Sequence, residues 1–251
     1  MRLLDLTLPT PAQNLALDEA LLEQAEQRGD AYQVLRLWEP LRPMVVLGRS
    51  SRPEAEVHLE VCRDLGIPVL RRPSGGTAIV TGPGCLMYAL VLYRNAHPAL
   101  RMVEQAHRFV LDRLANAFRP LVSSVCRRGI SDLAMGETKF SGNSLRCKRQ
   151  YLLYHGTILY DFPLELIDRC LAVPERQPEY RRGRPHLSFL GNLPLSAGEI
   201  RSILISAWSA NEPYPDWPQG LTAQLAREKY TRPEWNASHF TEAMRPDLAE
   251  P

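Results

Sequence analysis

The stretch "LRRPSGGTAIVTGPGCLMYALVL", residues 70–92, carries two adjacent arginines into a turn of small residues. Glycines at 75 and 76 allow positive φ and let other groups approach the backbone closely. Successive N–H groups in such a turn form a nest for anions, and the guanidinium groups of Arg71 and Arg72 can bind a phosphate or carboxylate. The pattern therefore predicts an anion-binding turn. A tight hairpin with solvated arginines explains it equally well, since the spacing matches neither the P-loop nor the Rossmann glycine motif.

The segments around this turn predict strands and helices in separate blocks. We expect strands at 2–6, 32–40, 44–50 and 67–72, and a pair of strands, 77–80 and 85–93, that meet across the turn 81–84. Helical spacing predicts helices at 14–27, with Asn14 as the N-cap, at 54–66, at 99–118 and at three places after residue 162. Short strands fill residues 121–161. This order favours an α+β fold with a mixed or antiparallel sheet flanked by helices.

Composition narrows the class of protein. Net charge is +2, from 30 Lys plus Arg against 28 Asp plus Glu, which argues against a nucleic-acid partner. No signal peptide and no run of 18 apolar residues is found, so we expect a cytoplasmic protein without a membrane segment. The cysteines lack metal-ligand spacing and predict reduced thiols; they are Cys62, Cys85, Cys126, Cys147 and Cys170.

A second segment, "GISDLAMGETKFSGNSLRCKRQYLLYHGTIL", residues 129–159, places Lys139 between two glycine-containing turns. A lysine held there can act as a compact cation on a carbonyl or phosphate oxygen. His155 precedes Gly156 on the next strand. A plain hairpin with a surface lysine and a histidine at the edge of the core is the alternative for each residue judged alone.

Taken together, five motifs resemble the lipoate–protein ligase A family, in order and spacing. They are "NLALDEALL", "RRPSGGTAIV", "SDLAMGETKFSGNS", "YHGTIL" and "EKYTRPEWN", the last at residues 228–236. The resemblance runs from about residue 14 to residue 236. It implies a catalytic domain like those of biotin and lipoyl ligases, within a superfamily that also contains octanoyltransferases.

The resemblance also implies an activity and a set of site residues. The family's ligases convert lipoate and ATP, with Mg²⁺, to lipoyl-AMP and pass the acyl group to a lysine of a lipoyl carrier domain or a glycine-cleavage H-type protein. The family's lysine falls on Lys139, the catalytic residue. Trp38 and Gly48 fall at the acyl pocket. The remaining binding residues are Arg71, Arg72, Ser74, Gly75, Gly76, Thr77, Asp132, Gly142, Asn143 and His155.

The sequence departs from the family pattern at three points. The third glycine of the turn is Thr77, and the usual His-Asp pair is Thr81-Gly82. We expect residues 1–251 to form a single catalytic domain without the C-terminal accessory domain of many ligases. That leaves a ligase that works alone, a ligase that needs a separate accessory protein, or a transferase. The departures also leave open a non-catalytic relative that binds the carrier or cofactor.

Cys126 is the candidate nucleophile of the transferase alternative, which transfers an octanoyl or lipoyl group without ATP. Arg127 and Arg128 follow it and would lower the pKa of a thiol. Its spacing to Lys139 is not that of the transferase branch, and a small strand residue in the core is the preferred reading. Cys85 and Cys170 are also expected in the core. The sequence does not separate lipoate from octanoate as the substrate.

A last candidate is the basic cluster in "PEYRRGRPHLSFLGNLPL", residues 178–195. Arg181, Arg182 and Arg184 surround Gly183. The cluster would dock an acidic carrier domain or close over the adenylate. A solvated loop is the alternative, and the family-like "FLGNL" favours the binding role slightly.

Overall fold

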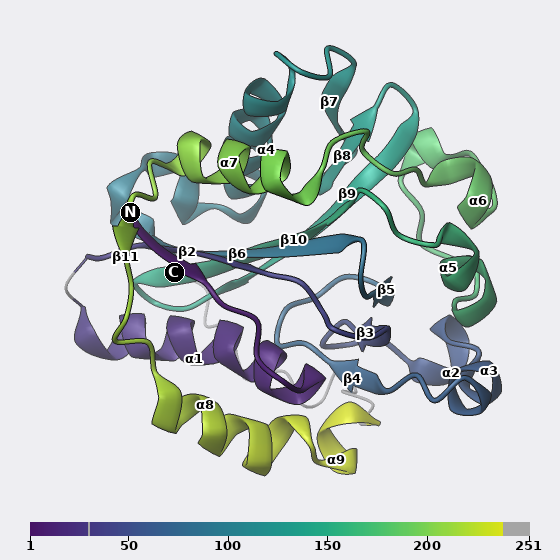
Figure 1. Cartoon of the computed structure of the whole chain (residues 1–251), viewed down its shortest axis with the longest axis horizontal. Coiled ribbons are helices and arrows are strands. Elements are labelled where there is room, and N and C mark those ends of the chain that lie inside the picture. Colours follow the sequence, from purple (N-terminus) through teal and green to yellow (C-terminus); the bar gives the residue numbers. More distant parts are fainter. Residues whose placement is uncertain (30, 238–251) are drawn as a thin grey trace.

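The computed structural model describes residues 1–29 and 31–237, and these contain a mixed eight-stranded sheet (Figure 1). Its order is β11-β1-β2-β6-β10-β9-β8-β7. Strands β11, β1 and β2 run parallel to one another, and every other neighbouring pair is antiparallel. The strands are β1 (Arg2–Asp5), β2 (Val34–Trp38), β6 (Cys85–Tyr93), β7 (Val125–Arg128), β8 (Asp132–Met135), β9 (Thr138–Cys147), β10 (Tyr151–Leu159) and β11 (Glu212–Pro213). The predicted class, α+β with a mixed sheet, is confirmed.

A second, three-stranded sheet carries the arginine turn. Its order is β4-β3-β5, with β3 at Met44–Leu47, β4 at Val69–Arg71 and β5 at Ile79–Thr81. The predicted pairing of 77–80 with 85–93 is therefore wrong. β5 pairs with β3, whereas β6 lies between β2 and β10 in the large sheet. Residues 82–84 thus carry the chain from one sheet to the other rather than closing a hairpin.

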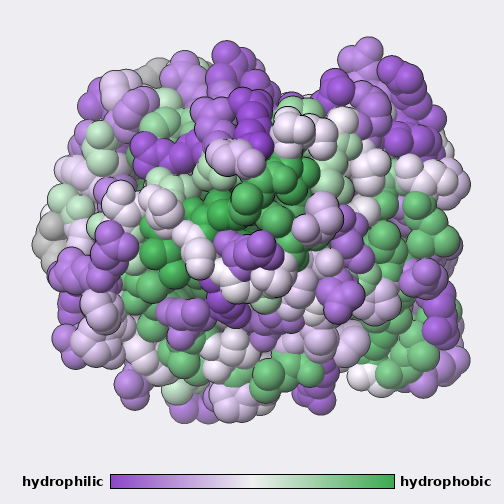
Figure 2. Space-filling view, turned by 45° about the horizontal axis from the view of Figure 1, so that its top comes forward, coloured by the Kyte–Doolittle hydropathy of each residue, from purple (hydrophilic) through white to green (hydrophobic). Residues whose placement is uncertain are grey.

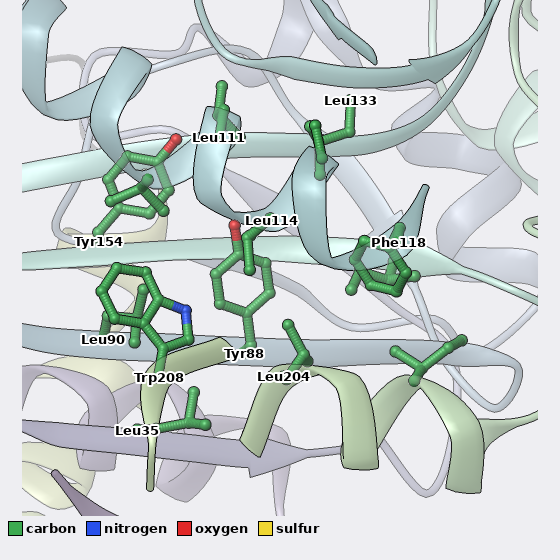
Figure 3. Packing of buried hydrophobic residues seen from close by; sticks show 14 of the residues in the cluster. Leu35, Tyr88, Leu90, Leu111, Leu114, Phe118, Leu133, Tyr154, Leu204 and Trp208 are labelled. Carbon is green, nitrogen blue, oxygen red and sulfur yellow. The ribbon is translucent and has the colours of Figure 1, made fainter. Parts of the chain in front are cut away.

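Helices cover both faces of the large sheet (Figure 1). Alternate residues of each central strand face opposite layers, as the strand period of two requires. Leu35 and Leu90 pack with α4 (Val103–Phe118) and α7 (Ala197–Trp208), as the close view shows (Figure 3). Val34 and Ala89 pack in a separate cluster with Leu17 of α1 (Pro11–Arg28). The sheet is therefore buried on both sides.

Shorter helices lie around the small sheet and in the last part of the described chain. They are α2 (Pro53–Glu56), α3 (Leu59–Asp64), α5 (Leu164–Cys170), α6 (His186–Phe189), α8 (Gln219–Leu225), a π-helical turn at Ala226–Tyr230 and α9 (Pro233–Asn236). None of the helices within the described residues is long and apolar enough to cross a membrane. Hydrophilic residues dominate the upper edge of the surface, and apolar residues gather in the middle of the face seen in Figure 2.

Two local predictions need correction. The N-cap of α1 is Thr10, whose hydroxyl accepts from the N–H of Gln13 while the Gln13 side chain accepts from the N–H of Thr10. Asn14 lies inside the helix instead, where its side chain hydrogen-bonds both the N–H and the C=O of Leu8. The helix predicted at 54–66 is split into α2 and α3, because Val57 is extended and bridges to Leu171.

Candidate functional site

Lys139 lies near the start of β9 and is held by one carboxylate. Its ammonium lies 2.8 Å from Asp132 Oδ1, and the other oxygen of that carboxylate accepts a 2.9 Å hydrogen bond from the Tyr180 hydroxyl. Asp132 is paired with Gly142 across β8 and β9. A Cβ added at Gly142 would lie 3.1 Å from the ammonium, so a glycine there leaves room for the lysine side chain. The lysine side chain keeps 24% of its surface exposed.

Two pockets meet at Lys139. Their empty volumes are about 700 Å³ and about 610 Å³, and both are lined by Thr77, Ile79, Lys139, Gly142 and Thr157. We call the first the β5 pocket; its other walls include Glu56, Ala78, Val80, Phe140, Leu159, Ile167, Leu171, Arg181, His186, Phe189 and Leu190. We call the second the α1 pocket; its other walls include Leu15, Asp18, Val46, Arg72, Gly76, Met87, Ser131, Asp132, Asn143, Ser144 and His155.

Arg72 shapes the turn from inside. Its guanidinium donates to the carbonyls of Val46, Gly75 and Thr77 at 3.1, 2.5 and 3.0 Å, and its Nε donates to the Ser74 hydroxyl. Burial lowers the pKa of Arg72 to about 10, so the group stays positive at neutral pH. Gly76 has φ +87°, a conformation that favours glycine. The turn is therefore folded around a buried cation, while the predicted binding residues Gly75, Gly76 and Thr77 are exposed.

Arg71 serves the fold rather than either pocket wall. It is fully buried and donates to the carbonyls of Gly48 and Ser51 at 2.7 and 2.8 Å, and to those of Trp235 and Asn236 in α9. It lines neither pocket. The alternative of solvated arginines is wrong for both residues, since their guanidinium groups bind backbone carbonyls.

A chain of side chains links Ser74 of the turn to the large sheet. The Ser74 hydroxyl lies 2.6 Å from His155 Nε2, and His155 Nδ1 lies 3.4 Å from Asp18 Oδ2. The other oxygen of Asp18 accepts from buried Arg36 at 2.5 Å. Ser74 is buried and outside both pocket walls, whereas His155 and Asp18 line the α1 pocket. The turn is thus fixed to β10 and α1.

Asn143 supports the wall beside Lys139. Its side-chain amide donates to the Ser131 carbonyl at 2.8 Å, and its oxygen accepts from the Tyr88 hydroxyl. A Cβ added at Gly156 would lie 1.8 Å from this oxygen. The glycine that follows His155 is therefore required for the close approach of Asn143.

Gly48 and Trp38, the two residues expected at the acyl pocket, line neither of the two pockets. Gly48 lies against the turn, where an added Cβ would lie 1.8 Å from the Gly76 carbonyl oxygen. Trp38 is completely buried in the core around β3, with the Arg36 guanidinium 4.9 Å from its ring, and it lines neither pocket. From β3, the residue that lines the α1 pocket is Val46.

Cys126 lies on β7, two strands from Lys139. It pairs with Ala134 of β8, which in turn pairs with Lys139. Its Sγ lies 3.8 Å from the Gly136 carbonyl oxygen, and it lines neither pocket. Cys85 and Cys170 are buried in the core, as predicted, whereas Cys126, also expected there, is only partly buried.

The basic cluster is divided among three roles. Arg181 lines the β5 pocket, Arg184 donates to the Glu137 carbonyl at 2.9 Å, and Arg182 is exposed with φ 51°. His186, which the sequence did not single out, lines the same pocket. Burial and the charge of Arg181 lower the pKa of His186, so its ring is neutral at pH 7.

Sequence reasoning missed Asp18, Tyr180, His186 and Glu56. Asp18 lies within the helix motif "NLALDEALL", and the signal was a carboxylate on the apolar face of an amphipathic helix. Tyr180 and His186 flank the arginines of a loop whose position no local pattern reveals. Glu56 accepts from the Ala78 N–H at 2.6 Å and so anchors the chain just before β5, in the wall of the β5 pocket.

Comparison with known proteins identifies this arrangement. A family model described as the lipoyl protein ligase A/B catalytic domain matches residues 10–194. An octanoyltransferase LipM from Geobacillus kaustophilus is 26% identical over 265 residues, covering 90% of this chain and 94% of that protein. A putative lipoate-protein ligase A from Aeropyrum pernix is 30% identical over 202 residues, covering 80% of this chain and 72% of that protein.

Solved structures agree with this assignment. A lipoate-protein ligase A bound with ATP superposes with a TM-score of 0.77 at 25% identity, covering 95% of this chain and 98% of that one. The bipartite lipoate protein ligase of Thermoplasma acidophilum, studied with its E2 lipoyl domain, shares the fold with a TM-score of 0.80 at 24% identity over 96% of this chain and 97% of that one. The family model spans most of the chain, and the chain therefore belongs to the lipoyl protein ligase A/B catalytic-domain family.

Proposed function

We propose that this protein is a lipoate–protein ligase, which activates lipoate or octanoate with ATP and transfers the acyl group to a lysine of a lipoyl carrier domain. The observation that carries the proposal is the junction of two pockets at one ammonium group, Lys139. An acyl-adenylate has two dissimilar halves joined at a mixed anhydride, so a two-part pocket with a cation at the junction suits it.

The β5 pocket suits the nucleotide half. Its walls are mainly apolar, and β5 is the edge strand of the small sheet, so backbone groups along its outer edge can meet the edge of a base. Lys139 and Arg181 place two positive charges on the same pocket, where a phosphate needs them. The α1 pocket, with Leu15, Val46 and Met87, is left for the acyl chain.

Lys139 can serve both half-reactions from one position. In the first, an oxygen of the acid attacks the α-phosphorus of ATP and pyrophosphate leaves. In the second, the carrier's lysine amine attacks the acyl carbonyl carbon and AMP leaves. Negative charge grows on the phosphoryl oxygens and then on the carbonyl oxygen, and a preorganised ammonium stabilises both. Asp132 holds that ammonium at the junction.

Magnesium enters this proposal with the nucleotide. Within residues 1–29 and 31–237, no three His, Cys, Asp or Glu side chains gather into a metal-ligating group. Mg²⁺ commonly binds through substrate phosphates and one or two carboxylates rather than in an all-protein cage. We therefore treat Mg²⁺ as part of the ATP substrate.

The transferase is the second candidate, favoured by the similarity to an octanoyltransferase over 90% of this chain. In that reaction Cys126 would take the acyl group from a thioester and pass it to the carrier lysine. Its position supports this less well, since Cys126 lies outside both pocket walls while Lys139 lines both.

The test compares two acyl donors. The purified chain is incubated with an apo lipoyl domain or an apo H-type protein, and carrier mass is measured. One arm supplies lipoate or octanoate with Mg²⁺ and ATP, and the other supplies octanoyl acyl carrier protein without ATP. Mass gain in the first arm that Cys126→Ala retains supports the ligase. Gain only in the second arm, lost in Cys126→Ala, supports the transferase and overturns the ligase. Adenylate or carrier binding without product in either arm supports a non-catalytic relative.

A further inference from the structure

Residues 178–191, which contain the basic cluster, hold Lys139 from two sides. At the backbone, the Gly191 N–H donates to the Lys139 carbonyl at 2.9 Å. At the side chain, the Tyr180 hydroxyl donates to Asp132 Oδ2, and the other oxygen of that carboxylate, Oδ1, binds the lysine ammonium. The segment also bonds the turn before the lysine, through Arg184 and the Glu137 carbonyl. A single segment thus fixes the position of the lysine's main chain and of its counter-ion.

The tyrosine is itself held firmly. It is 9% exposed, and its ring packs on Phe189 with ring centres 5.2 Å apart. Gly129 also lies against the ring, since an added Cβ there would lie 3.7 Å from it. Burial and the neighbouring Asp132 charge raise the pKa of Tyr180, so the phenol stays protonated and remains a donor.

We propose that Tyr180 is a positioning residue for acyl transfer: its hydroxyl fixes the Asp132 carboxylate in the rotation that holds the Lys139 ammonium at the junction of the two pockets. The inference rests on the proposed function for its kinetic consequences only. A carboxylate with one anchored oxygen presents the other in a fixed direction, and a preorganised cation stabilises a transition state more than a mobile one does. Arg181, the next residue, lines the β5 pocket, so the same segment contacts the substrate site.

The first measurement separates turnover from binding. Tyr180→Phe keeps the ring and removes the donor. We expect kcat to fall about tenfold, the usual effect of losing a hydrogen bond to a charged group, with KM for the acid and for ATP within about twofold. The matched control is Tyr160→Phe, since the Tyr160 hydroxyl donates to the Glu39 carboxylate outside both pockets. Unchanged kcat in Tyr180→Phe, or an equal loss in the control, overturns the proposal.

A double-mutant cycle asks whether Tyr180 acts through Asp132. If it does, Asp132→Asn combined with Tyr180→Phe is no slower than Asp132→Asn alone, because the hydroxyl no longer has a carboxylate to fix. Rate losses that multiply instead would show that Tyr180 acts independently of Asp132, contrary to the proposal. Thermal melts of all variants give the folded fraction by which each rate is corrected.

The second measurement needs no enzymatic activity. The chain contains only three lysines, Lys139, Lys148 and Lys229, so trace acetylation with isotope-labelled acetic anhydride can be read at each by mass spectrometry. Lys148 and Lys229 are paired with Glu23 and Glu19 and serve as internal references. We expect Tyr180→Phe to accelerate labelling of Lys139 severalfold relative to both references. An unchanged ratio overturns the inference. A wild-type chain inactive in both donor arms would refute the proposed function and leave this result standing.

Discussion

The Arg71–Gly76 turn and the Lys139 hairpin both set cations beside glycines, yet they use those cations in opposite ways. In the turn, Arg71 and Arg72 direct their guanidinium groups at backbone carbonyls and hold loops together; Arg72 also lines the α1 pocket, whereas Arg71 lines neither pocket. In the hairpin, Lys139 is held by one carboxylate and lines both pockets. The guanidinium is a planar fork with five donors, suited to joining several carbonyls, whereas an ammonium is a compact charge. The difference teaches that a cation's partners, not its presence in a motif, decide whether it can meet a substrate.

The largest expected effect tests the hairpin side of this contrast. Lys139→Ala should lower turnover by roughly 10²–10³-fold, the usual cost of losing one preorganised donor to developing negative charge. The melting temperature should also fall, because the Asp132 carboxylate is 6% exposed and loses its cation, so turnover is corrected for the folded fraction. Lys139→Arg should rescue poorly, since a planar fork cannot take the place of an ammonium. Steady-state acyl transfer and a thermal melt of each variant check this. Near-wild-type turnover in Lys139→Ala would show that Lys139, like Arg71, plays no part in the reaction.

The next effect tests the turn side, where we expect the reverse. Arg71→Met keeps an apolar stem but leaves buried carbonyls of Gly48 and Ser51 without their donor. Unsatisfied buried groups cost about 1–3 kcal/mol each, so the free energy of unfolding should fall by about 3 kcal/mol. Turnover per folded molecule should stay within a few-fold of wild type. Urea unfolding together with activity corrected for the folded fraction measures both. A stable variant with little turnover would place Arg71 in the substrate site instead.

A smaller effect sharpens the comparison within the turn. Ser74→Ala removes the hydroxyl that lies 2.6 Å from His155 Nε2. Because a buried partner then loses its hydrogen bond, stability should fall by about 1–2 kcal/mol. The turn stays in place through Arg72, so turnover should drop less than tenfold. An activity loss as large as that of Lys139→Ala would mean that the serine takes part in the chemistry.

The smallest effect concerns the pH dependence of stability, through His186 of α6, which lines the β5 pocket together with Lys139. Burial and Arg181 lower the pKa of His186 below its ordinary value of about 6.5. The unfolded chain therefore binds this proton at a higher pH than the folded one. The stability contribution is complete above that ordinary value and is lost as pH falls toward the folded pKa, by at most about 1.4 kcal/mol per unit.

His186→Gln should flatten this loss, because an amide can replace both ring hydrogen bonds without taking up a proton. Those bonds join Nδ1 to the Arg181 guanidinium and Nε2 to the Ala172 carbonyl. Urea unfolding of both proteins between pH 5 and 8 gives the comparison. Parallel curves for the two proteins would contradict the prediction.

Local sequence patterns predicted the helices and strands better than they predicted which strands pair and which residues bond. The helix around Leu15–Leu22 and the strand at 85–93 follow from apolar spacing, and the mixed sheet followed from their order. The pairing of 77–80 with 85–93 failed because Gly82-Pro83-Gly84 looks like a hairpin turn, while β5 finds a better partner in β3. The prediction that Asn14 caps the helix was wrong because its side-chain oxygen accepts hydrogen bonds from Leu8, outside the helix, and from Arg36, distant in sequence.

The site shows the same limit. The family resemblance predicted Lys139 and Asp132 as site residues, because both lie within one short sequence motif. It did not point to Tyr180 or Asp18 as site residues. Tyr180 contacts Asp132, 48 positions away, and Asp18 contacts His155, 137 positions away. The resemblance also could not show that Arg71 and Arg72 are occupied by carbonyls, since hydrogen-bond partners of a buried cation depend on the packed fold.

The tie between Arg71 and α9 has a consequence for the order of events during synthesis. The Arg71 N–H and side chain bond Trp235 and Asn236 across 164 and 165 positions of sequence. Contacts of such separation are made late in folding, because a long loop must close before they form. The lysine hairpin of β8 and β9 pairs residues that lie close together in sequence, so it can form before residues 233–236 join the fold. The loops around Arg71 are completed only when α9 docks, so a change in the last described helix should affect the late steps of folding rather than either pocket wall.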